Sequence, residues 1–266
     1  MGRRTVLNIL GALLLCTAVS SAASAQDFQR SYQLGQNGSI RIENVSGNIN
    51  VASHDGSTVS VSAFKEGPDR DQVEVEDLST PDRVHLRAKY PADGCRNCNA
   101  SLRFEVRVPR SGVYVERIST ASGDVTATDL SGRINLSTAS GDVTLQNASG
   151  EIDASTASGR VKVTNASGSV RASSASGDVE VEIARLEGTR DLRFSSASGD
   201  VRVRLPGDLD ARVHLSTASG HIETDFPIEV KRHEYGGGST ARGQLGGGSR
   251  SVRISTASGD VSLKSL

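Results

Sequence analysis

The sequence is poor in aromatic residues and has no excess of positive charge. Its 266 residues include five Phe, four Tyr and no Trp, so that aromatic side chains make up 3% of the chain. Sites that stack nucleobases or sugar rings depend on these side chains, and the shortage argues against both. The 30 Lys and Arg residues are balanced by 31 Asp and Glu residues. A nucleic-acid binder would show a basic surplus, so no nucleic-acid partner is expected.

Long apolar runs are missing after the N-terminus. Arg3 and Arg4 precede a mostly apolar stretch over residues 6–19, and small residues ending at Ala25 follow it. This is the pattern of a secretory signal peptide, here over residues 1–25. No later stretch approaches the roughly 18 apolar residues of a transmembrane helix. We therefore expect an exported protein, periplasmic or on the cell surface, with no transmembrane segment after signal cleavage.

Cysteine is also scarce, and two of the three cysteines stand close together. Cys95 and Cys98 lie between the strand-like segments 83–90 and 102–109, and export would favour their oxidation. We therefore predict a small Cys95–Cys98 disulfide at the tip of a hairpin. A thioredoxin-like redox site needs this spacing at the start of a helix, and a zinc site needs two further ligands. The sequence shows neither pattern.

A nine-residue repeat dominates the second half of the chain. Ser-Gly recurs with apolar residues two and four places after the glycine, and these glycines stand at positions 123, 132, 141, 150, 159, 168 and 177. The alternation predicts strands of about five residues with one buried face. Val143 and Val161 are among the residues expected to point inward. The fixed glycine predicts a turn that needs a positive φ or a close approach of two chains.

A longer period is superposed on the first. The stronger signature Ser/Thr-Ala-Ser-Gly ends at glycines 123, 141, 159 and 177, and then at 199, 220 and 259 after longer spacings. Eighteen residues predict one coil with two short sides, and each coil is expected to lie on the previous one at about 4.8 Å. The longer spacings predict loops inserted into single coils. The glycine-rich stretch before residue 250 predicts a flexible excursion.

Together the patterns predict an all-β, single-domain β-solenoid over residues 26–266, built from nine-residue Ser-Gly repeats with about 18 residues per coil. Residues 26–118 would form an irregular N-terminal part, since the alternation there has no fixed period. Residues 119–266 would hold the regular repeats, with the glycine-rich insertion near 226–250.

Several segments also carry a resemblance to a known family. They are SIRIENVSGNINV at residues 39–51, the repeated STASGDV units, the glycine-rich insertion and the closing VRISTASGDVSL. Over about residues 28–266 the chain resembles the bacterial domain-of-unknown-function family of β-strand-repeat proteins described as putative adhesins. The resemblance implies an exported or envelope-associated β-solenoid. It implies no catalytic or ligand-binding residues.

An aspartate follows many of the repeat glycines and would form a column along one edge of the solenoid. The members of this column are Asp124, Asp142, Asp178, Asp200 and Asp260. Calcium-binding nonapeptide solenoids use a denser pattern that supplies six or more oxygens. Here each unit offers one carboxylate, and Arg160 interrupts the column. We expect these aspartates to cap turns and keep calcium as the weaker alternative; no cofactor is expected.

Hydroxyl residues three places before the signature glycines predict a second row. They are Thr120, Thr138, Thr156, Thr217 and Thr256, with serine at 174 and 196. Regular threonines on a flat solenoid face are typical of ice-binding surfaces, but the T-x-T pairs that those surfaces use are absent at this position. Hydrogen bonding between stacked hydroxyls is the expected role.

No catalytic motif accompanies the repeats. Ser62 and Lys65 form an S-x-x-K pattern, but on an alternating strand the two side chains face opposite sides. G-x-S-x-G is absent, and the five histidines lack metal-ligand spacing. A glycan-cleaving solenoid would hold two facing carboxylates in a groove, and distant carboxylates could still meet in the fold. We predict a protein that is not an enzyme.

These observations favour a structural or adhesin-like role for an exported, non-catalytic β-repeat protein at the bacterial cell envelope. Its partner would be an unidentified envelope or surface component. One alternative is a binding module that holds an envelope or signalling partner with the loop Phe226–Gly248, which includes His233 and Tyr235. A less favoured alternative is a β-solenoid glycan-active enzyme.

Overall fold

A computed structural model of the chain describes residues 27–91, 98–188, 190–232 and 237–266. Within these residues there are 22 β-strands and one short 3-10 helix, Arg70–Gln72. The predicted all-β fold is confirmed. The predicted signal peptide lies outside the described residues. No helix in the described ranges has the length and apolar character needed to cross a membrane.

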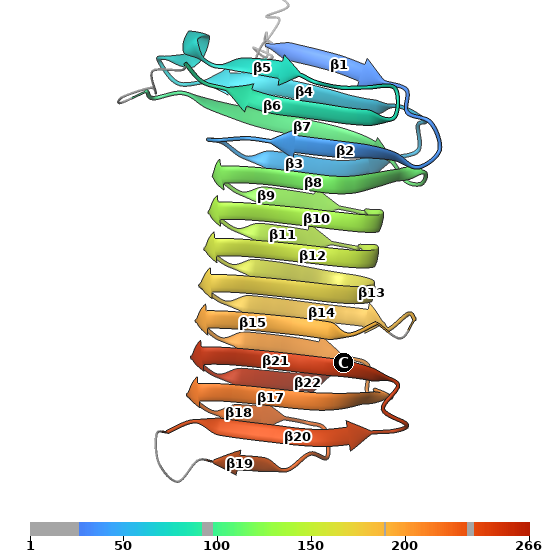
Figure 1. The fold of residues 1–266 in the computed structure, drawn as a ribbon, viewed down its shortest axis with the longest axis vertical. Coiled ribbons are helices and arrows are strands. Elements are labelled where there is room, and N and C mark those ends of the chain that lie inside the picture. The colour runs from blue at the N-terminus through green and yellow to red at the C-terminus, as the bar shows by residue number, and fades with distance from the viewer. Residues whose placement is uncertain (1–26, 92–97, 189, 233–236) are drawn as a thin grey trace, which may run out of the picture.

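The strands form two long stacks, and the front sheet is the stack that faces the viewer in Figure 1. Its regular strands are parallel, and antiparallel strands are added at both ends. In order along the stack its strands are β5 (Glu74–Asp77), β6 (Arg83–Lys89), β2 (Gly38–Glu43), β8 (Val113–Ser122), β10 (Ser131–Ser140), β12 (Ser149–Ser158), residues 167–176 of β13 (Val161–Ser176), β15 (Leu192–Ser198), β21 (Arg250–Ser258), β17 (Ala211–Ser219), β20 (Ser239–Leu245) and β19 (Val230–Arg232).

The back sheet lies behind the front sheet, and β13 contributes to both because it turns the corner between them. In order along the stack the strands of the back sheet are β1 (Phe28–Tyr32), β4 (Val59–Glu66), β7 (Ser101–Pro109), β3 (Ile49–His54), β9 (Val125–Thr128), β11 (Val143–Gln146), residues 161–164 of β13, β14 (Val179–Arg185), β16 (Val201–Leu205), β22 (Val261–Ser265) and β18 (Ile222–Thr224). Together the two sheets form a solenoid-like stack.

Neighbouring coils lie on one another in parallel register. Ile134 of β10 is opposite Ile152 of β12, and Val143 of β11 is opposite Val161 of β13. Each repeat position therefore meets its equivalent in the next coil, and side chains of one kind form rows along the stack. These rows make up the surfaces of the molecule.

The two sheets enclose one narrow core. Val143 and Val161 are both 0% exposed, which confirms that they point inward. The interior consists mainly of Val, Ile, Leu and Ala, and its fully buried phenylalanines are Phe104 and Phe194. A space this narrow explains why the sequence contains so few aromatic residues.

Two coils are out of sequence order. The coil of β2 and β3 lies between that of β6 and β7 and that of β8 and β9. At the other end, the coil of β21 and β22 lies between that of β15 and β16 and that of β17 and β18. The prediction that each coil lies on the previous one is therefore wrong at both ends. The prediction fails because a strand can pair in parallel with any strand whose edge matches its own, whether or not the two are neighbours in the sequence.

The glycine-rich segment is not a flexible excursion where the structure describes it. Its residues 239–245 form β20, which pairs antiparallel with β17 on one side and β19 on the other. Gly246 and Gly248, with φ of 58° and 71°, turn the chain back into β21. Asp210 Oδ1 accepts a 2.6 Å hydrogen bond from the Gly248 N–H. Because glycine adopts positive φ without strain, these residues let the chain reverse and pass the end of β17, which lies between β20 and β21. His233 and Tyr235 lie outside the described residues.

Candidate binding face

The corner between front and back strands shows why the repeat keeps a glycine. Gly141 joins β10 to β11 with φ of 142°, a conformation that residues with side chains rarely adopt. A Cβ atom at Gly141 would also collide with the carbonyl oxygen of Gly123 in the neighbouring coil. The coils can stack at strand spacing only while this position has no side chain.

The aspartates that follow these glycines hydrogen-bond to the backbone of the next coil. Asp124 Oδ1 accepts from the N–H of Asp142 at 2.9 Å, and Asp142 Oδ1 accepts from the N–H of Arg160 at 2.7 Å. The same contact joins Asp178 to the N–H of Asp200, Asp200 to that of Asp260, and Asp260 to that of His221. Each carboxylate thus caps a turn. Arg160 receives such a bond through its backbone, but its side chain has no acceptor with which to cap the next turn.

The predicted metal and disulfide residues have different outcomes. In the ranges that the structure describes, no three His, Cys, Asp or Glu side chains come together in a way that could hold a metal ion. The aspartate column acts as a series of turn caps, and calcium binding by it stays the weaker prediction. Cys95 lies outside the described residues, so its pairing with Cys98 also stays a prediction.

The predicted row of threonines points into the core. Thr138 and Thr156 are each 6% exposed and donate 2.9 Å hydrogen bonds to the carbonyl oxygens of Gly123 and Gly141. The equivalent contacts to a corner glycine are made by Thr120, Ser174, Ser196, Thr217 and Thr256. The hydroxyls therefore bond to the backbone and not to one another, because the corner carbonyl lies within their reach. Buried threonines cannot form an ice-binding surface.

The sequence interpretation missed a row at the opposite corner. Asp129, Asn147 and Asn165 adopt φ of 56°, 52° and 53°. Asn147 Nδ2 donates to Asp129 Oδ1 at 3.0 Å, and Asn165 Nδ2 donates to Asn147 Oδ1 at 2.8 Å. Asn and Asp tolerate the left-handed region better than other side chains do. Their regular spacing in the sequence is the signal that could have identified this corner.

The outer face of the front sheet contains a groove of about 1190 Å³ over β8, β10, β12 and β13. Its lining includes Tyr114, which is 40% exposed, and the backbone of Gly132 and Gly150. The charged side chains around it include Glu116, Arg133, Glu151, Asp153, Arg171 and Arg190. The groove therefore presents both signs of charge on a rigid sheet.

Glu151 is the acidic residue in this groove that faces two arginines. Its Oε1 is 2.6 Å from Arg190 Nη2, and its Oε2 is 3.9 Å from Arg133 Nε. Asp153 follows on the same face of β12 and is exposed. Glu151 is thus paired with cations on both oxygens, an arrangement that suits a recognition surface better than a proton donor.

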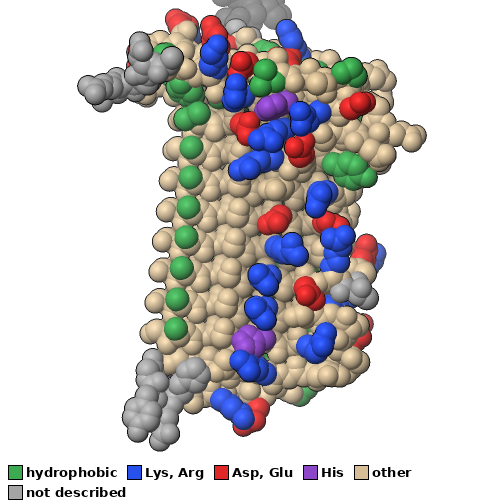
Figure 2. Space-filling model, viewed as in Figure 1, with side chains coloured by type: hydrophobic (Ala, Val, Ile, Leu, Met, Phe, Trp, Pro, Cys, Tyr) green, Lys and Arg blue, Asp and Glu red, His purple; other side chains and the backbone are tan. Residues whose placement is uncertain are grey.

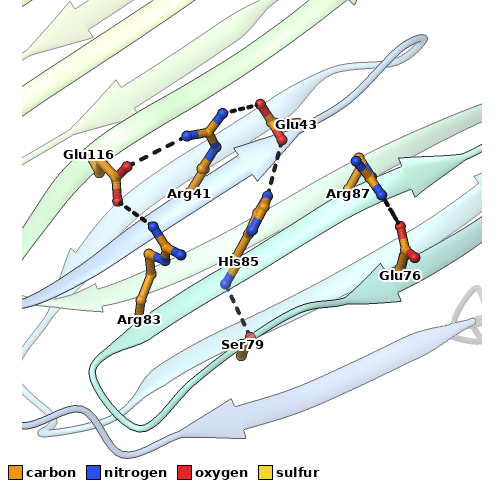
Figure 3. A network of polar contacts seen from close by, with 8 residues as sticks. All are labelled: Arg41, Glu43, Glu76, Ser79, Arg83, His85, Arg87 and Glu116. Atoms are coloured by element: carbon orange, nitrogen blue, oxygen red, sulfur yellow. Dashed lines mark hydrogen bonds and ion pairs between the residues drawn. The ribbon is translucent and has the colours of Figure 1, made fainter.

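At the N-terminal end of the front sheet the charges form a paired network (Figure 3). Glu43 of β2 is 2.7 Å from Arg41 Nη2 and 3.0 Å from His85 Nε2 of β6. Glu116 of β8 is 3.6 Å from Arg41 Nη1 and 3.8 Å from Arg83 Nη1. The hydrogen bond from Arg41 is the main cause that lowers the pKa of Glu43 to about 2, against the effect of burial. The network ties together three strands that are not in sequence order.

Farther along the same face the charges repeat without partners. One residue from each of β13, β15, β21, β17 and β20 lies directly opposite the next. Figure 2 shows basic side chains along the middle of this face. We call this set the arginine row; it consists of Arg171, Arg193, Arg253, His214 and Arg242. All four arginines are exposed, and among the described residues their side chains have no ion pair or hydrogen bond. Burial, followed by the charges of Arg242 and Arg253, lowers the pKa of His214.

The back sheet of the same coils arranges its charges differently. In the strand register Glu180 lies between Lys162 and Arg202, at 4.0 Å from Lys162 Nζ and 3.9 Å from Arg202 Nη1. Arg204 Nη1 is 3.6 Å from Glu182 Oε2 on the adjacent strand. Like charges directly opposite one another destabilise a sheet. The back sheet alternates the two signs around Glu180, and where Arg204 lies opposite Lys264 the lysine amine is paired with Glu223 and Asp225. The arginine row keeps like charges opposite one another, and among the described residues its arginines have no such carboxylate partner.

Comparison with known proteins finds similar solved structures at low sequence identity. Solved structures similar to this chain include a putative cell adhesion protein from Clostridium sporogenes, 12% identical, with 90% of this chain and 99% of that chain covered and a TM-score of 0.37. A putative adhesin from Bacteroides fragilis is 13% identical, with 90% and 96% covered and a TM-score of 0.39. A putative lipid binding protein from Parabacteroides distasonis is 13% identical, with 90% and 96% covered and a TM-score of 0.41.

No curated protein matches the sequence. The model of the family described as Toastrack DUF4097, a domain of unknown function, matches residues 111–264, which is more than half of the chain and includes the arginine row. This match confirms the resemblance to a domain-of-unknown-function family. The chain belongs to the Toastrack DUF4097 family.

Proposed function

We propose that the protein is a non-catalytic, adhesin-like binding module of the cell envelope that holds its partner on the outer face of the front sheet. The observation that carries this proposal is the continuous row structure of that face. Equivalent side chains repeat from strand to strand, on a sheet whose regular strands are hydrogen-bonded on both sides. Such a surface can contact an extended partner along many coils without rearrangement.

The predicted signal peptide supports a location at the cell envelope. The pattern of residues 1–25 predicts a signal peptide, and a solenoid assembled from eighteen-residue coils would work as a rigid spacer outside the cell membrane. The front face is favoured over the glycine-rich loop because residues 239–245 are held in a paired strand.

The absence of catalysis is part of the proposal. A glycan-cleaving site in the groove would need two facing carboxylates. Glu151, a candidate for one of them, has an arginine near each of its carboxylate oxygens. If the protein nevertheless released reducing ends from a glycan, and Glu151→Gln abolished the release, the non-catalytic role would be contradicted.

An adhesion assay with two matched variants tests the binding face. Beads coated with residues 26–266 should adhere to cells or to isolated envelope material. Ser155→Trp would obstruct the front face and Thr144→Trp the back face, from half-exposed positions on outward rows. Adhesion should fall with Ser155→Trp and persist with Thr144→Trp. Loss with only the back-face variant, or no adhesion by the unmodified protein, would contradict the proposal.

A further inference from the structure

We propose that the arginine row binds an extended acidic polysaccharide that carries one carboxylate on each sugar unit. This inference rests on the proposed function, because it gives a ligand class to the front face. It does not require the groove beside β8 and β10.

The geometry of the row suits a repeating chain. Arg171 and Arg242 lie on the first and the last of five neighbouring strands. Four strand intervals therefore separate them, or about 19 Å at 4.8 Å each. A hexose unit in a glycan chain is about as long as one such interval. A polyuronate lying across the strands could therefore place successive carboxylates beside successive members of the row.

The charges of the row lack a counter-ion within the described residues. Arg193 and Arg253 lie directly opposite one another and are both exposed, without an ion pair to either side chain. At the N-terminal end of the same sheet, Arg41 and Arg87 have carboxylate partners in Glu43 and Glu76. Guanidinium groups bind carboxylates through paired hydrogen bonds, so a polyuronate would supply the partner that the row lacks.

Hydroxyl groups run beside the arginines on the same face. On the four parallel strands they lie two residues after the basic residue, and the register aligns Ser173, Ser195, Ser255 and Ser216. A hydroxyl both donates and accepts hydrogen bonds, as the hydroxyls of a sugar do. The face thus offers a line of cations for carboxylates next to a line of hydroxyls for the sugar rings.

The row also has a direction. Asp153 lies opposite Arg171 at the end nearest the groove and reverses the sign of the charge. A polyanion would be repelled there and attracted toward Arg242. The site therefore extends from β13 to β20. Beside it, exposed Arg212 stands two residues before His214 and exposed Asp191 two residues before Arg193, so the charges that flank the row balance.

Other polyanions fit this face less well. Single-stranded nucleic acid binds where bases can stack on aromatic rings, and no member of the row or of the hydroxyl line is aromatic. Binding to a lipid surface adds apolar contacts, and the exposed large apolar residues among those described are Val45, Leu78, Tyr114 and Leu266, none of them in the row. Ionic recognition of a sugar chain needs neither feature, so the shortage of aromatics does not oppose it.

Calorimetric titration of polygalacturonate into residues 26–266 tests the inference. The double variant R193S/R253S should weaken binding by roughly tenfold or more, because it removes two charge-assisted contacts. R107S/R160S removes two exposed arginines that have no ion pair and lie off the row. This control should change the affinity by about twofold at most. Binding should also weaken as salt rises.

Several outcomes would overturn the inference. The first is that polygalacturonate does not bind, and the second is that R193S/R253S and R107S/R160S lose equal affinity for it. The third is that oligo-dT or phosphatidylglycerol vesicles bind more tightly than polygalacturonate does. Thermal melting checks that R193S/R253S folds, and it should melt no lower than the unmodified protein because repulsion in the row is relieved.

The adhesion assay separates this inference from the proposed function. If R193S/R253S loses polygalacturonate but cells still adhere, the row is a polysaccharide site and the adhesive contact lies elsewhere on the face. If polygalacturonate is not bound while Ser155→Trp still blocks adhesion, the inference fails and the proposed function stands.

Discussion

The hydroxyl of Thr138 donates a 2.9 Å hydrogen bond to the carbonyl oxygen of Gly123, fifteen residues earlier at the corner of the neighbouring coil. Thr138 is 6% exposed, so water can hardly replace the contact. Replacing Thr138 with Val keeps the shape of the side chain and leaves the carbonyl without this donor. We expect Thr138→Val to lower the free energy of unfolding by about 1–2 kcal/mol in denaturant titrations. Thr138→Ser retains the hydroxyl and should cost less; equal losses would show that the hydrogen bond contributes nothing.

The corner glycines should differ sharply in their tolerance of a methyl group. Gly141→Ala places a Cβ against the Gly123 carbonyl at φ of 142°, and should destabilise the protein by about 3 kcal/mol or more. Gly112 has φ of 82° with no atom within 4 Å of a Cβ. Gly112→Ala should therefore cost only about 1 kcal/mol, the backbone strain alone. If both variants melt together, close approach of the coils is not what requires the glycine.

The network around Glu43 should make the free energy of unfolding depend on pH in the acidic range. The pKa of Glu43 is lowered to about 2 in the folded protein, mainly by the hydrogen bond from Arg41, whereas an unfolded Glu titrates near about 4.3. The folded state thus binds fewer protons than the unfolded state in this range. The contribution of ionised Glu43 to the free energy of unfolding is therefore full above about pH 4.3 and is lost as the pH falls toward 2. Glu43→Gln should be destabilised relative to the unmodified protein at pH 6, with the difference shrinking across this window. A difference independent of pH would contradict the ionic origin.

The pKa of His214 responds to the positive charges of the arginine row. Its pKa is lowered by burial and by Arg242 of β20 and Arg253 of β21, and Arg212 stands two residues away on its own strand. Arg253→Ser should raise the pKa of His214 in an NMR titration, because one of the repelling charges is removed. Arg107→Ser on the back sheet should leave it unchanged. Saturating polygalacturonate should also raise it, whereas no shift with either the variant or the ligand would contradict the assigned field.

Much of the fold follows from the sequence because each position of the repeat keeps a residue type with one structural role. Apolar alternation identified Val143 and Val161 as core residues, and the fixed glycine marked a corner. The order of the coils could not be predicted, since β21 has the same signature as β15 and β17 and can pair with either. The antiparallel strand β20 was mistaken for a flexible linker because the glycine-rich stretches that flank it are also typical of linkers.

The binding face could be predicted only in part. Arg171, Arg193 and Arg253 each stand six places before a signature glycine, at 177, 199 and 259, so the row has a trace in the sequence. The sequence does not show that the row is continuous, because β21 lies between β15 and β17 in the fold but follows both of them along the chain. Arg190, which pairs with Glu151, lies just before β15, and His85, which pairs with Glu43, lies on β6, so both contacts depend on the same stacking.

Site-specific photo-crosslinking tests the central claim that the front sheet is the binding face. A photoreactive amino acid replaces Asn135 on the outer face of β10 or Thr126 on the outer face of β9, both half-exposed positions in regular strands. After incubation with isolated envelope material, illumination should attach the partner at position 135 and not at position 126. Attachment at position 126 alone, or at neither position under conditions in which the protein adheres, would contradict the account.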